Sequence, residues 1–211
     1  MDLHPKNREN FDRYSVTAWF YDILDYPWEL QYRKWRPKLL AEVRGSVLEV
    51  GVGTGRNLPH YPAQVEHLTA LDFSPAMLQR ARRRAQGAVC PVRFVEDDVC
   101  TMISIPSGTF DWVVACFLCC VLPAEVQDQA LAQISRVLKP AGRFCLLEMV
   151  YSKDPRLRRR QDRFAPFVEK VYGARFDRNT LEHAKATPGL IVTGTRFLKH
   201  DTYLLIDGIR S

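Results

Sequence analysis

Three glycines at alternating positions, Gly51, Gly53 and Gly55, follow directly on the apolar segment 47–50. Because glycine has no side chain, a strand that ends in such a loop lets the backbone approach a bound small molecule closely. The fingerprint of dinucleotide-binding proteins would place its third glycine at position 56, where this chain has Arg56. The spacing therefore favours a nucleoside-like cofactor and disfavours the pyrophosphate of a dinucleotide.

Acidic side chains follow the next two predicted strands. Asp72 lies about 20 residues beyond the glycines, where nucleoside-binding α/β folds place a carboxylate that accepts the ribose hydroxyls. That position alone fits NAD as well. Asp98 adds discrimination, because a carboxylate there can accept the exocyclic amine of adenine while the backbone of Val99 donates to the ring. The alternative is that Asp97 and Asp98 only cap a turn.

Cys116 and Cys119 have the spacing of half a metal or redox site. No second pair of Cys or His residues follows at a zinc-binding distance, and most of the six cysteines lie in apolar segments. Such thiols are usually reduced and buried. We therefore predict no metal site, and the sequence shows no catalytic triad.

The composition fits one globular domain, with 46% hydrophobic and 26% charged residues among 211. The formal net charge of +6 favours anionic partners or surfaces, although soluble proteins that bind none often carry as much. No apolar run of about 18 residues is present to span a bilayer, and the start at Met1 and Asp2 lacks the apolar core of a signal peptide. We expect an intracellular, cytoplasmic protein.

Strands and helices alternate over the middle of the chain. Strands are predicted at 46–50, 67–71, 92–95, 110–117 and 143–150, and helices from near Gly55, at 75–86 and at 124–138. Two further strand-like segments, 190–197 and 202–209, form an antiparallel hairpin. This pattern predicts a doubly wound α/β fold: a seven-stranded, mostly parallel sheet with helices on both faces and the hairpin at one edge.

We predict a single domain, 1–211, in three parts. Residues 1–44 form an aromatic-rich helical segment that caps the substrate, because nine of the 23 aromatic residues lie between positions 11 and 35. Residues 45–150 form the cofactor-binding core. Residues 151–211 form a basic amphipathic helix and the C-terminal hairpin.

Five segments in the same order resemble the motifs of the class I S-adenosylmethionine-dependent methyltransferases: 47–57, 71–78, 94–99, 109–114 and 136–142. The resemblance covers roughly residues 14–150 and implies a Rossmann-like methyltransferase with S-adenosyl-L-methionine as its cofactor. Two positions depart from the family pattern, because Asp97 and Ala141 stand where glycines are usual.

The resemblance also implies a role for each matching residue. Glu49 steadies the glycine loop, whose glycines line the methionine moiety, and Asp72 binds the ribose. The whole implied cofactor-binding set is Tyr14, Glu49, Gly51, Gly53, Gly55, Asn57, Asp72, Phe73, Met77, Asp98, Val99, Ala115 and Cys116. Within it, Phe73 and Met77 flank the adenine, Asp98 and Val99 read its edge, and the backbone at Ala115 and Cys116 faces the methionine amino group.

The N-terminal segment bears on the methyl acceptor. Its spacing of Tyr14, Ala18, Tyr21 and Asp22 resembles bacterial phosphatidylethanolamine N-methyltransferases and quinone C-methyltransferases, while segments 33–40 and 57–62 lean towards lipid and thiol methyltransferases. Tyr21 is the candidate catalytic residue, with its hydroxyl at the reacting nitrogen. The alternative is that most of these aromatic residues only pack a helix onto the sheet.

The leading acceptor is a phospholipid amine, followed by a quinone ring carbon or a small thiol. A non-catalytic, membrane-associated regulator that binds the cofactor is the alternative from another class. The Pro-Pro loop of enzymes that methylate nucleobase amines is missing after segment 110–117, and no nucleic-acid-binding motif is present. We therefore expect a small-molecule or lipid acceptor and no nucleic acid.

Segment 154–178 contains a basic amphipathic helix. Its apolar residues recur on one helical face, at Phe164, Phe167, Val168, Val171 and Tyr172, and arginines precede or flank them. Such a helix either makes peripheral contact with an anionic membrane or packs its apolar face on the core with its arginines in water. The arginines of segment 79–84 are expected mainly to solvate their helix.

Overall fold

The computed structural model describes residues 3–211, apart from the side chains of residues 15, 16 and 18. Met1 and Asp2, where the chain start was considered as a signal peptide, lie outside the described residues. The side chain of Ala18, part of the N-terminal signature, also lies outside them. No helix among the described residues is both long enough and apolar enough to cross a membrane.

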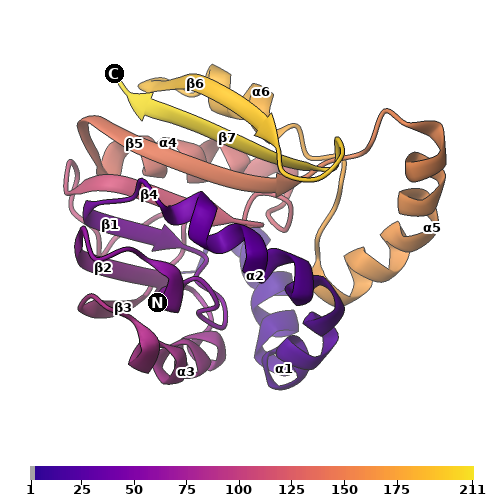
Figure 1. Cartoon of the computed structure of the whole chain (residues 1–211), viewed down its shortest axis with the longest axis horizontal. Helices are drawn as coiled ribbons and strands as arrows, with labels where there is room; N and C mark the ends of the chain where they lie inside the picture. The colour runs from indigo at the N-terminus through magenta and orange to yellow at the C-terminus, as the bar shows by residue number, and fades with distance from the viewer. Residues whose placement is uncertain (1–2) are drawn as a thin grey trace.

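Seven strands of the described chain form one sheet in the order β3-β2-β1-β4-β5-β7-β6 (Figure 1). Their bounds are β1 Gly45–Val50, β2 Val65–Asp72, β3 Val92–Glu96, β4 Phe110–Cys116, β5 Leu138–Met149, β6 Leu190–Phe197 and β7 Tyr203–Arg210. The pairs from β3 to β5 are parallel, and β7 runs antiparallel between β5 and β6. The predicted fold class is confirmed, including the antiparallel hairpin at one edge.

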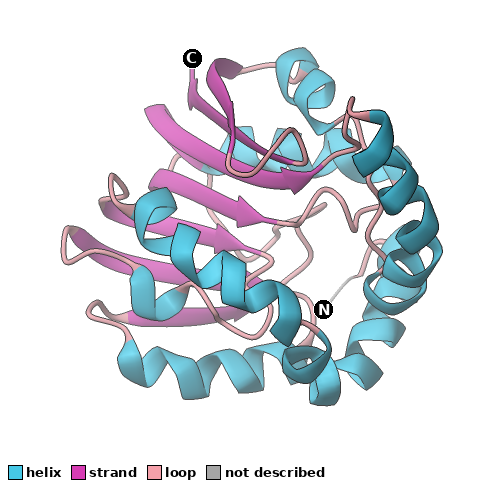
Figure 2. Ribbon diagram, turned by 45° about the vertical axis from the view of Figure 1, so that its right-hand side comes forward, coloured by secondary structure: helices cyan, strands magenta, loops and turns pink. Residues whose placement is uncertain are grey.

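Helices cover both faces of the sheet (Figure 2). They are α1 Arg8–Leu24, α2 Tyr26–Leu40, α3 Pro75–Arg84, α4 Gln127–Val137, α5 Pro155–Tyr172 and α6 Thr180–Ala186. Successive residues of β1 point to opposite faces, so Val47 packs with α2 and α3 while Leu48 packs with α4 and α6. Both apolar layers are fully buried at β1, which fixes the register of the strand that leads into the glycine loop.

The predicted helix near Gly55 is wrong. The segment between β1 and β2 contains a single 3-10 turn, Leu58–His60, and otherwise turns and extended chain. Pro59 and Pro62 each lack a backbone donor, and the ring of Pro62 would clash with the carbonyl four residues before it in a helix. A short loop therefore replaces the helix and keeps Asn57 next to β1.

Other boundaries shift by a few residues. Ser74 caps α3 as expected, with its Oγ accepting from the backbone N of Met77 at 3.4 Å. The predicted helix 124–138 begins with a 3-10 turn, Ala124–Val126, and β5 already begins at Leu138. Ala141, where the family has glycine, adopts a left-handed backbone with φ of 58°, a conformation that favours glycine.

The N-terminal helices α1 and α2 form a cap beside the carboxyl ends of the parallel strands (Figure 1). Only Asp25 separates α1 from α2, and α5 packs against α1 from the other end of the chain. The C-terminal turn of α5 buries Val168 and Tyr172 with Tyr21 and Trp28 of the cap. Segments about 150 residues apart in sequence are thus brought together over the end of the sheet.

Candidate cofactor and acceptor site

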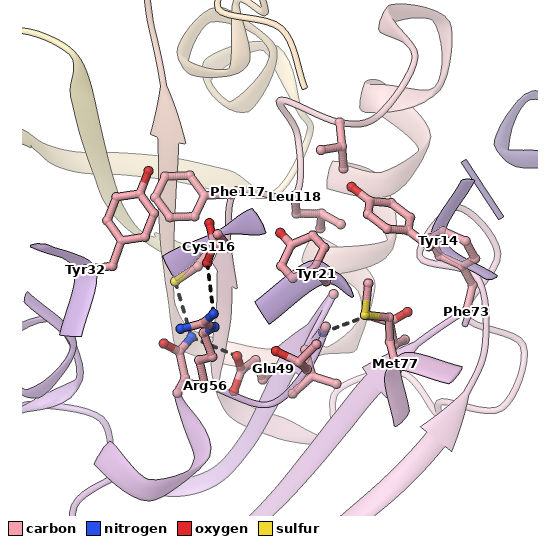
Figure 3. A pocket seen from close by; sticks show the side chains of 18 of the residues that line it. Tyr14, Tyr21, Tyr32, Glu49, Arg56, Phe73, Met77, Cys116, Phe117 and Leu118 are labelled. Carbon is pink, nitrogen blue, oxygen red and sulfur yellow. Dashed lines mark hydrogen bonds and ion pairs between the residues drawn. The ribbon is translucent and has the colours of Figure 1, made fainter. Parts of the chain in front are cut away.

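A cavity of about 810 Å³, partly open to solvent, lies at the carboxyl ends of β1, β2 and β4. The chain order reverses between β1 and β4, and such switch points are where open α/β sheets bind ligands. Residues after the strands form one wall, and residues of α1 and α2 form the other. Figure 3 shows Phe73 and Met77 at one end of the cavity, and Tyr32 and Phe117 at the other.

Most of the residues predicted for the site line this cavity. They are Tyr14, Tyr21, Glu49, Gly51, Gly53, Asn57, Asp72, Phe73, Met77 and Cys116. Gly55, Asp98, Val99 and Ala115 are not among the lining residues. Ala115 is the fully buried neighbour of Cys116 in β4.

The glycine loop is held by backbone contacts to β2. The amides of Gly51 and Val52 both donate to the carbonyl of Leu71, at 2.9 and 3.0 Å. Gly53 has φ of 54°, and a Cβ built on it would meet no described atom within 4 Å, so its backbone borders open space. Gly55 serves a different purpose, because a Cβ there would lie 2.8 Å from the backbone of Ala81 in α3. Its lack of a side chain lets the loop pack on α3.

Asp72 ends β2 with its carboxylate in the cavity. Oδ2 accepts from the amide of Gly53 at 2.8 Å and Oδ1 from the amide of Ser74 at 2.9 Å. Burial raises the pKa of Asp72 to about 6, against the opposing effect of these two amides. A carboxylate has about four acceptor sites, so both oxygens keep capacity for a ligand's hydroxyl groups.

Glu49 in β1 is the second buried carboxyl group of the cavity. It is 2% exposed, and its Oε1 accepts from Nδ2 of Asn57 at 2.8 Å. Its Oε2 is buried without a hydrogen-bond partner among the described residues. Burial raises the pKa of Glu49 to about 7, although Asn57 and the neighbouring Tyr61 hydroxyl act to lower it. A cationic group in the cavity would supply the missing partner.

Asp98 contacts the N-terminal segment. Nδ2 of Asn7 donates to both of its carboxylate oxygens, at 2.8 and 3.0 Å, and the amide of His4 donates to Oδ2 at 2.9 Å. Asp98 is fully buried and also accepts from the amide of Cys100. Asp97 instead accepts from the amides of Asp98 and Ser104. In this structure the carboxylate predicted to read adenine is therefore bonded to the chain itself.

The cavity also has four titratable lining residues that were not predicted from the sequence, three from the cap and one, Arg56, from the loop after β1. Asp25, Tyr32, Arg36 and Arg56 all line the cavity. Asp25 follows Tyr21 by four positions and therefore shares its helical face, a spacing that could have identified it. Burial raises the pKa of Asp25 to about 6, although the charge of Arg56, 3.5 Å away, opposes this.

Asp22 ties α1 to the glycine loop and to α3. Its carboxylate accepts from Oγ1 of Thr54 in the glycine loop at 2.9 Å and pairs with Arg84 at 2.8 Å and Arg80 at 3.3 Å. Arg56 also lies 3.2 Å from it. The expectation that the arginines of segment 79–84 mainly solvate α3 is therefore wrong for Arg80 and Arg84, which hold α1 on α3.

The two tyrosines of the N-terminal signature point into the cavity (Figure 3). The hydroxyl of Tyr14 donates to the carbonyl of Tyr172 at 2.7 Å, so it links α1 to α5. The ring of Tyr21 lies edge-on to that of Tyr172, with 5.8 Å between centroids. Burial raises the pKa of both phenols far above the ordinary value, so they stay protonated at neutral pH. They can donate or accept hydrogen bonds but cannot serve as bases.

The basic helix fits neither prediction alone. Val168 and Tyr172 are buried against the cap, as a packed surface helix requires. Phe164 and Phe167, on the same predicted apolar face, are 56% and 48% exposed. The cysteines are free thiols, and the described residues contain no group of three or more metal-binding side chains.

Comparisons with known proteins agree with this architecture. A family described as "Methyltransferase domain" matches residues 47–142. The chain is 39% identical over 99 residues to a phosphatidylethanolamine N-methyltransferase of Cereibacter sphaeroides, which covers 46% of this chain and 47% of that protein. It is 30% identical over 201 residues to a demethylmenaquinone methyltransferase of Deinococcus radiodurans, which covers 92% of this chain and 75% of that protein.

Solved structures share the fold at low sequence identity. An O-methyltransferase family protein from Burkholderia thailandensis aligns with a TM-score of 0.75 and 17% identity, over 98% of this chain and 63% of that one. Magnesium protoporphyrin IX methyltransferase from Synechocystis, with bound SAH, aligns with a TM-score of 0.71 and 14% identity, over 98% of this chain and 100% of that one.

The chain belongs to the class I S-adenosylmethionine-dependent methyltransferases. It is a methyltransferase that uses S-adenosylmethionine as its methyl donor. The cavity fits this cofactor, because the buried carboxyl group of Glu49 lines it and can face a methionine ammonium group, and the open backbone at Gly53 leaves room beside Asp72. The chain spans about half the length of the matching phosphatidylethanolamine N-methyltransferase.

Proposed function

We propose that the strand-end wall of the cavity binds S-adenosylmethionine with the contacts implied by the sequence. Asp72 accepts the ribose hydroxyls, Glu49 and Asn57 face the methionine end, and Phe73 and Met77 flank the adenine. The observation that carries this assignment is the convergence of the glycine loop and two buried carboxyl groups on one cavity. When bound, the cofactor supplies an electrophilic methyl group on a sulfonium for in-line transfer.

Asp98 and Val99 complete the proposed adenine site. Since Asn7 donates to both carboxylate oxygens of Asp98, adenine recognition by this residue requires Asn7 to move or to share it. The N-terminal segment then changes its contacts when the cofactor binds. Residues 1–44 are proposed to act as the substrate cap, 45–150 as the cofactor-binding core, and 151–211 as the basic amphipathic helix and C-terminal hairpin that complete the domain.

The acceptor that the cavity favours is an amine, and we propose a phospholipid amine of the phosphatidylethanolamine kind. Tyr21, Tyr32 and Phe117 present aromatic rings to the cavity beside the carboxyl group of Asp25. Aromatic faces and a carboxylate attract an ammonium group, whereas a quinone or thiol gains nothing from the negative charge. The similarity to a phosphatidylethanolamine N-methyltransferase supports the same class.

An ammonium acceptor must lose a proton before its nitrogen can attack the methyl group. Tyr21 cannot take this proton because its pKa is raised far above the ordinary value by burial. Asp25 is suited to the task, since its pKa of about 6 leaves it mostly ionised at neutral pH. We therefore assign proton removal to Asp25, with Tyr21 positioning the nitrogen through its hydroxyl.

A quinone ring carbon is the second candidate. The demethylmenaquinone methyltransferase of D. radiodurans aligns over 92% of this chain, twice the share covered by the phosphatidylethanolamine enzyme. The aromatic wall of the cavity would also suit a flat ring. Both acceptors are lipids, so either implies peripheral contact with a membrane surface, and a small thiol ranks behind them.

Incubation with labelled S-adenosylmethionine and a panel of phosphatidylethanolamine, a demethylquinone and an alkyl thiol, read by mass spectrometry, tests the acceptor. We expect methylated phosphatidylethanolamine. The wild-type rate should rise between about pH 6 and 8 as Asp25 becomes ionised, and Asp25→Asn should be slower and lack the part of this rise that Asp25 causes. Transfer to the quinone alone would replace the proposed acceptor. Cofactor binding without transfer to any of the three would favour a binding role.

A further inference from the structure

The outward face of α1 carries large apolar side chains in contact with solvent. Trp19, Phe20 and Ile23 are 66%, 60% and 72% exposed. The opposite face of the same helix carries Tyr21, which lines the cavity together with Asp25 directly after the helix. A helix that packs only its inner face on a protein core has polar residues on its outer face. α1 departs from this rule, so its outer side is suited to a second apolar environment.

The neighbouring helices also carry exposed large apolar side chains. Tyr26 and Leu30 of α2 are 60% and 42% exposed, and Phe164 and Phe167 of α5 are 56% and 48% exposed. α5 lies beside α1 because its last turn packs edge-on against an α1 ring (Figures 1 and 2). Seven of the eleven exposed large apolar side chains in the described part of the chain lie on these three helices. We call these seven the exposed apolar face.

Positive charge borders the exposed apolar face. The sequence of α5 contains six basic and two acidic residues. Arg160 and Arg163 each precede an exposed phenylalanine, Phe164 and Phe167, by one helical turn, and both arginines are themselves exposed. Aromatic side chains beside arginines are typical of helices that lie in the interface of an anionic bilayer, with rings at the acyl boundary and guanidinium groups at the phosphates.

This charge also argues against a second copy of the chain as the occupant. A two-fold contact through the exposed apolar face would bring the same patch of both copies together. The arginine-rich sides of two α5 helices would then lie close, and like charges in a contact disfavour it. An anionic lipid surface satisfies the apolar and the basic residues together.

We propose that the exposed apolar face docks this enzyme on an anionic phospholipid bilayer. The proposal rests on the proposed function, because docking matters for catalysis only if the acceptor is a membrane lipid. Since the helix that inserts its outer side lines the cavity with its inner side, a lipid head group entering past α1 would reach Tyr21 and Asp25 directly.

Sedimentation with vesicles tests the surface. Wild-type protein is expected to bind vesicles of phosphatidylglycerol and phosphatidylcholine, to lose binding with added salt, and to bind pure phosphatidylcholine poorly. Phe164→Ser/Phe167→Ser should weaken binding to the anionic vesicles by about tenfold or more. Val89→Ser/Ile103→Ser is the matched control, since these residues are 65% and 68% exposed on other parts of the surface. Its binding should equal that of the wild type.

Three results would overturn docking: no binding of the wild type to anionic vesicles at low salt, equal losses in both double variants, or a dimer by light scattering that Phe164→Ser/Phe167→Ser dissociates. Trp19→Ser/Ile23→Ser gives a second, independent test on α1. Methyl transfer to a short-chain, water-soluble phosphatidylethanolamine separates the two proposals. If variants that no longer bind vesicles still methylate this soluble lipid at the wild-type rate, the result supports docking. If the wild type binds vesicles but does not methylate the soluble lipid, only the proposed acceptor is contradicted.

Discussion

The two walls of the cavity are built in different ways. The donor wall comes from the ends of β1, β2 and β4, and many of its contacts are backbone amides and carbonyls of the glycine loop. The cap wall comes from α1 and α2, which pack on α5 through the rings around Tyr172 and on α3 through the ion pairs of Asp22. Under the proposed assignment, cofactor recognition is fixed by strand geometry, whereas acceptor recognition depends on individual side chains that packing brings together.

Removing Asp72 is the strongest test of the donor wall. Asp72→Ala should weaken binding of S-adenosylhomocysteine by about 100-fold or more, because it deletes two charge-assisted hydrogen bonds to the ribose and releases the amide of Gly53. Calorimetric titration measures the affinity. Asp111→Ala is the control, since Asp111 also accepts a backbone amide, that of Ser46, but at the other end of the central strands β1 and β4. An equal loss in both variants would contradict the assigned role of Asp72.

The next largest effect is expected from a substitution that breaks the contacts between the cap wall and the donor wall. Asp22→Ala should lower the free energy of unfolding by about 1–3 kcal/mol and cofactor affinity by about tenfold, because Thr54, Arg80 and Arg84 lose their common partner. Thermal unfolding and calorimetry measure the two effects.

The stabilisation by Asp22 should also depend on pH. Burial acts to raise the pKa of Asp22, but the hydrogen bond and charge of Arg84 outweigh it and the pKa falls below 3.8. Its contribution is therefore present above about pH 4 and lost as the pH falls further. Asp162→Ala, in an exposed pair with Arg158, should change neither stability nor affinity. If Asp162→Ala lowered stability and cofactor affinity as much as Asp22→Ala, the role of Asp22 in joining the two walls would be contradicted.

The same contrast explains what the sequence could predict. The alternation of strands and helices and the hairpin follow from local periodicity and turn residues, so all seven strands were predicted, although β5 begins five residues earlier than expected. Asp72, Glu49 and the glycines follow from their order after strands. The helix near Gly55 was predicted wrongly from the alternation of strands and helices, although Pro59 and Pro62, which lack backbone donors, disfavour a continuous helix there.

The cap wall was predicted less completely because its contacts are not local. Asp25 and Arg56 lie 31 positions apart and meet only through the packing of α1 on the glycine loop. The pairing of Asn7 with Asp98 spans 91 positions. The exposure of Phe164 beside the burial of Val168 depends on where α5 ends against α1. Periodicity identifies a helical face, but only tertiary packing decides which part of that face is covered.

Chemistry at the cap wall should respond to Tyr21 without disturbing the donor wall. Tyr21→Phe should lower turnover by about tenfold and leave cofactor affinity unchanged, because only the hydroxyl that positions the acceptor is lost. Steady-state kinetics together with calorimetry separate the two. Tyr14→Phe is the informative control, since it loses the bond to the carbonyl of Tyr172 and should affect stability more than turnover. An unchanged turnover in Tyr21→Phe would mean that Tyr21 only packs the helix onto the sheet.

Proton release should report on the donor wall. Glu49 has its pKa raised by burial from 4.5 to about 7, so the free protein binds more protons than the unfolded chain and loses stability as the pH rises through this window. A methionine ammonium beside Glu49 favours its ionised form. Binding of S-adenosylhomocysteine at pH near 6.5 should therefore release protons, seen as a binding enthalpy that depends on the buffer's ionisation enthalpy. Glu49→Gln should reduce that dependence, and an unchanged dependence would contradict the contact.

The smallest change in cofactor affinity is expected at Asn7, directly before α1. Its amide occupies both oxygens of Asp98, the carboxylate proposed to bind the adenine amine. Asn7→Ala should destabilise the free protein by about 1–3 kcal/mol, because buried Asp98 loses two donors. The same variant should bind S-adenosylhomocysteine a few-fold more tightly, since the ligand no longer displaces Asn7 and now restores a missing partner. Calorimetry measures the affinity, and thermal unfolding with and without ligand measures the stabilisation.

Asn10→Ala separates this competition from simple anchoring of α1. Asn10 is also buried near the start of α1, and its Nδ2 donates to the carbonyl of Val121 at 2.7 Å without contacting Asp98. Loss of an anchor should weaken or leave unchanged the affinity in both variants. Tighter binding in Asn7→Ala alone would mean that the cap and the cofactor share one carboxylate. Weaker binding in both would mean that Asn7 only fastens the cap, and that Asp98 serves the fold instead of the adenine.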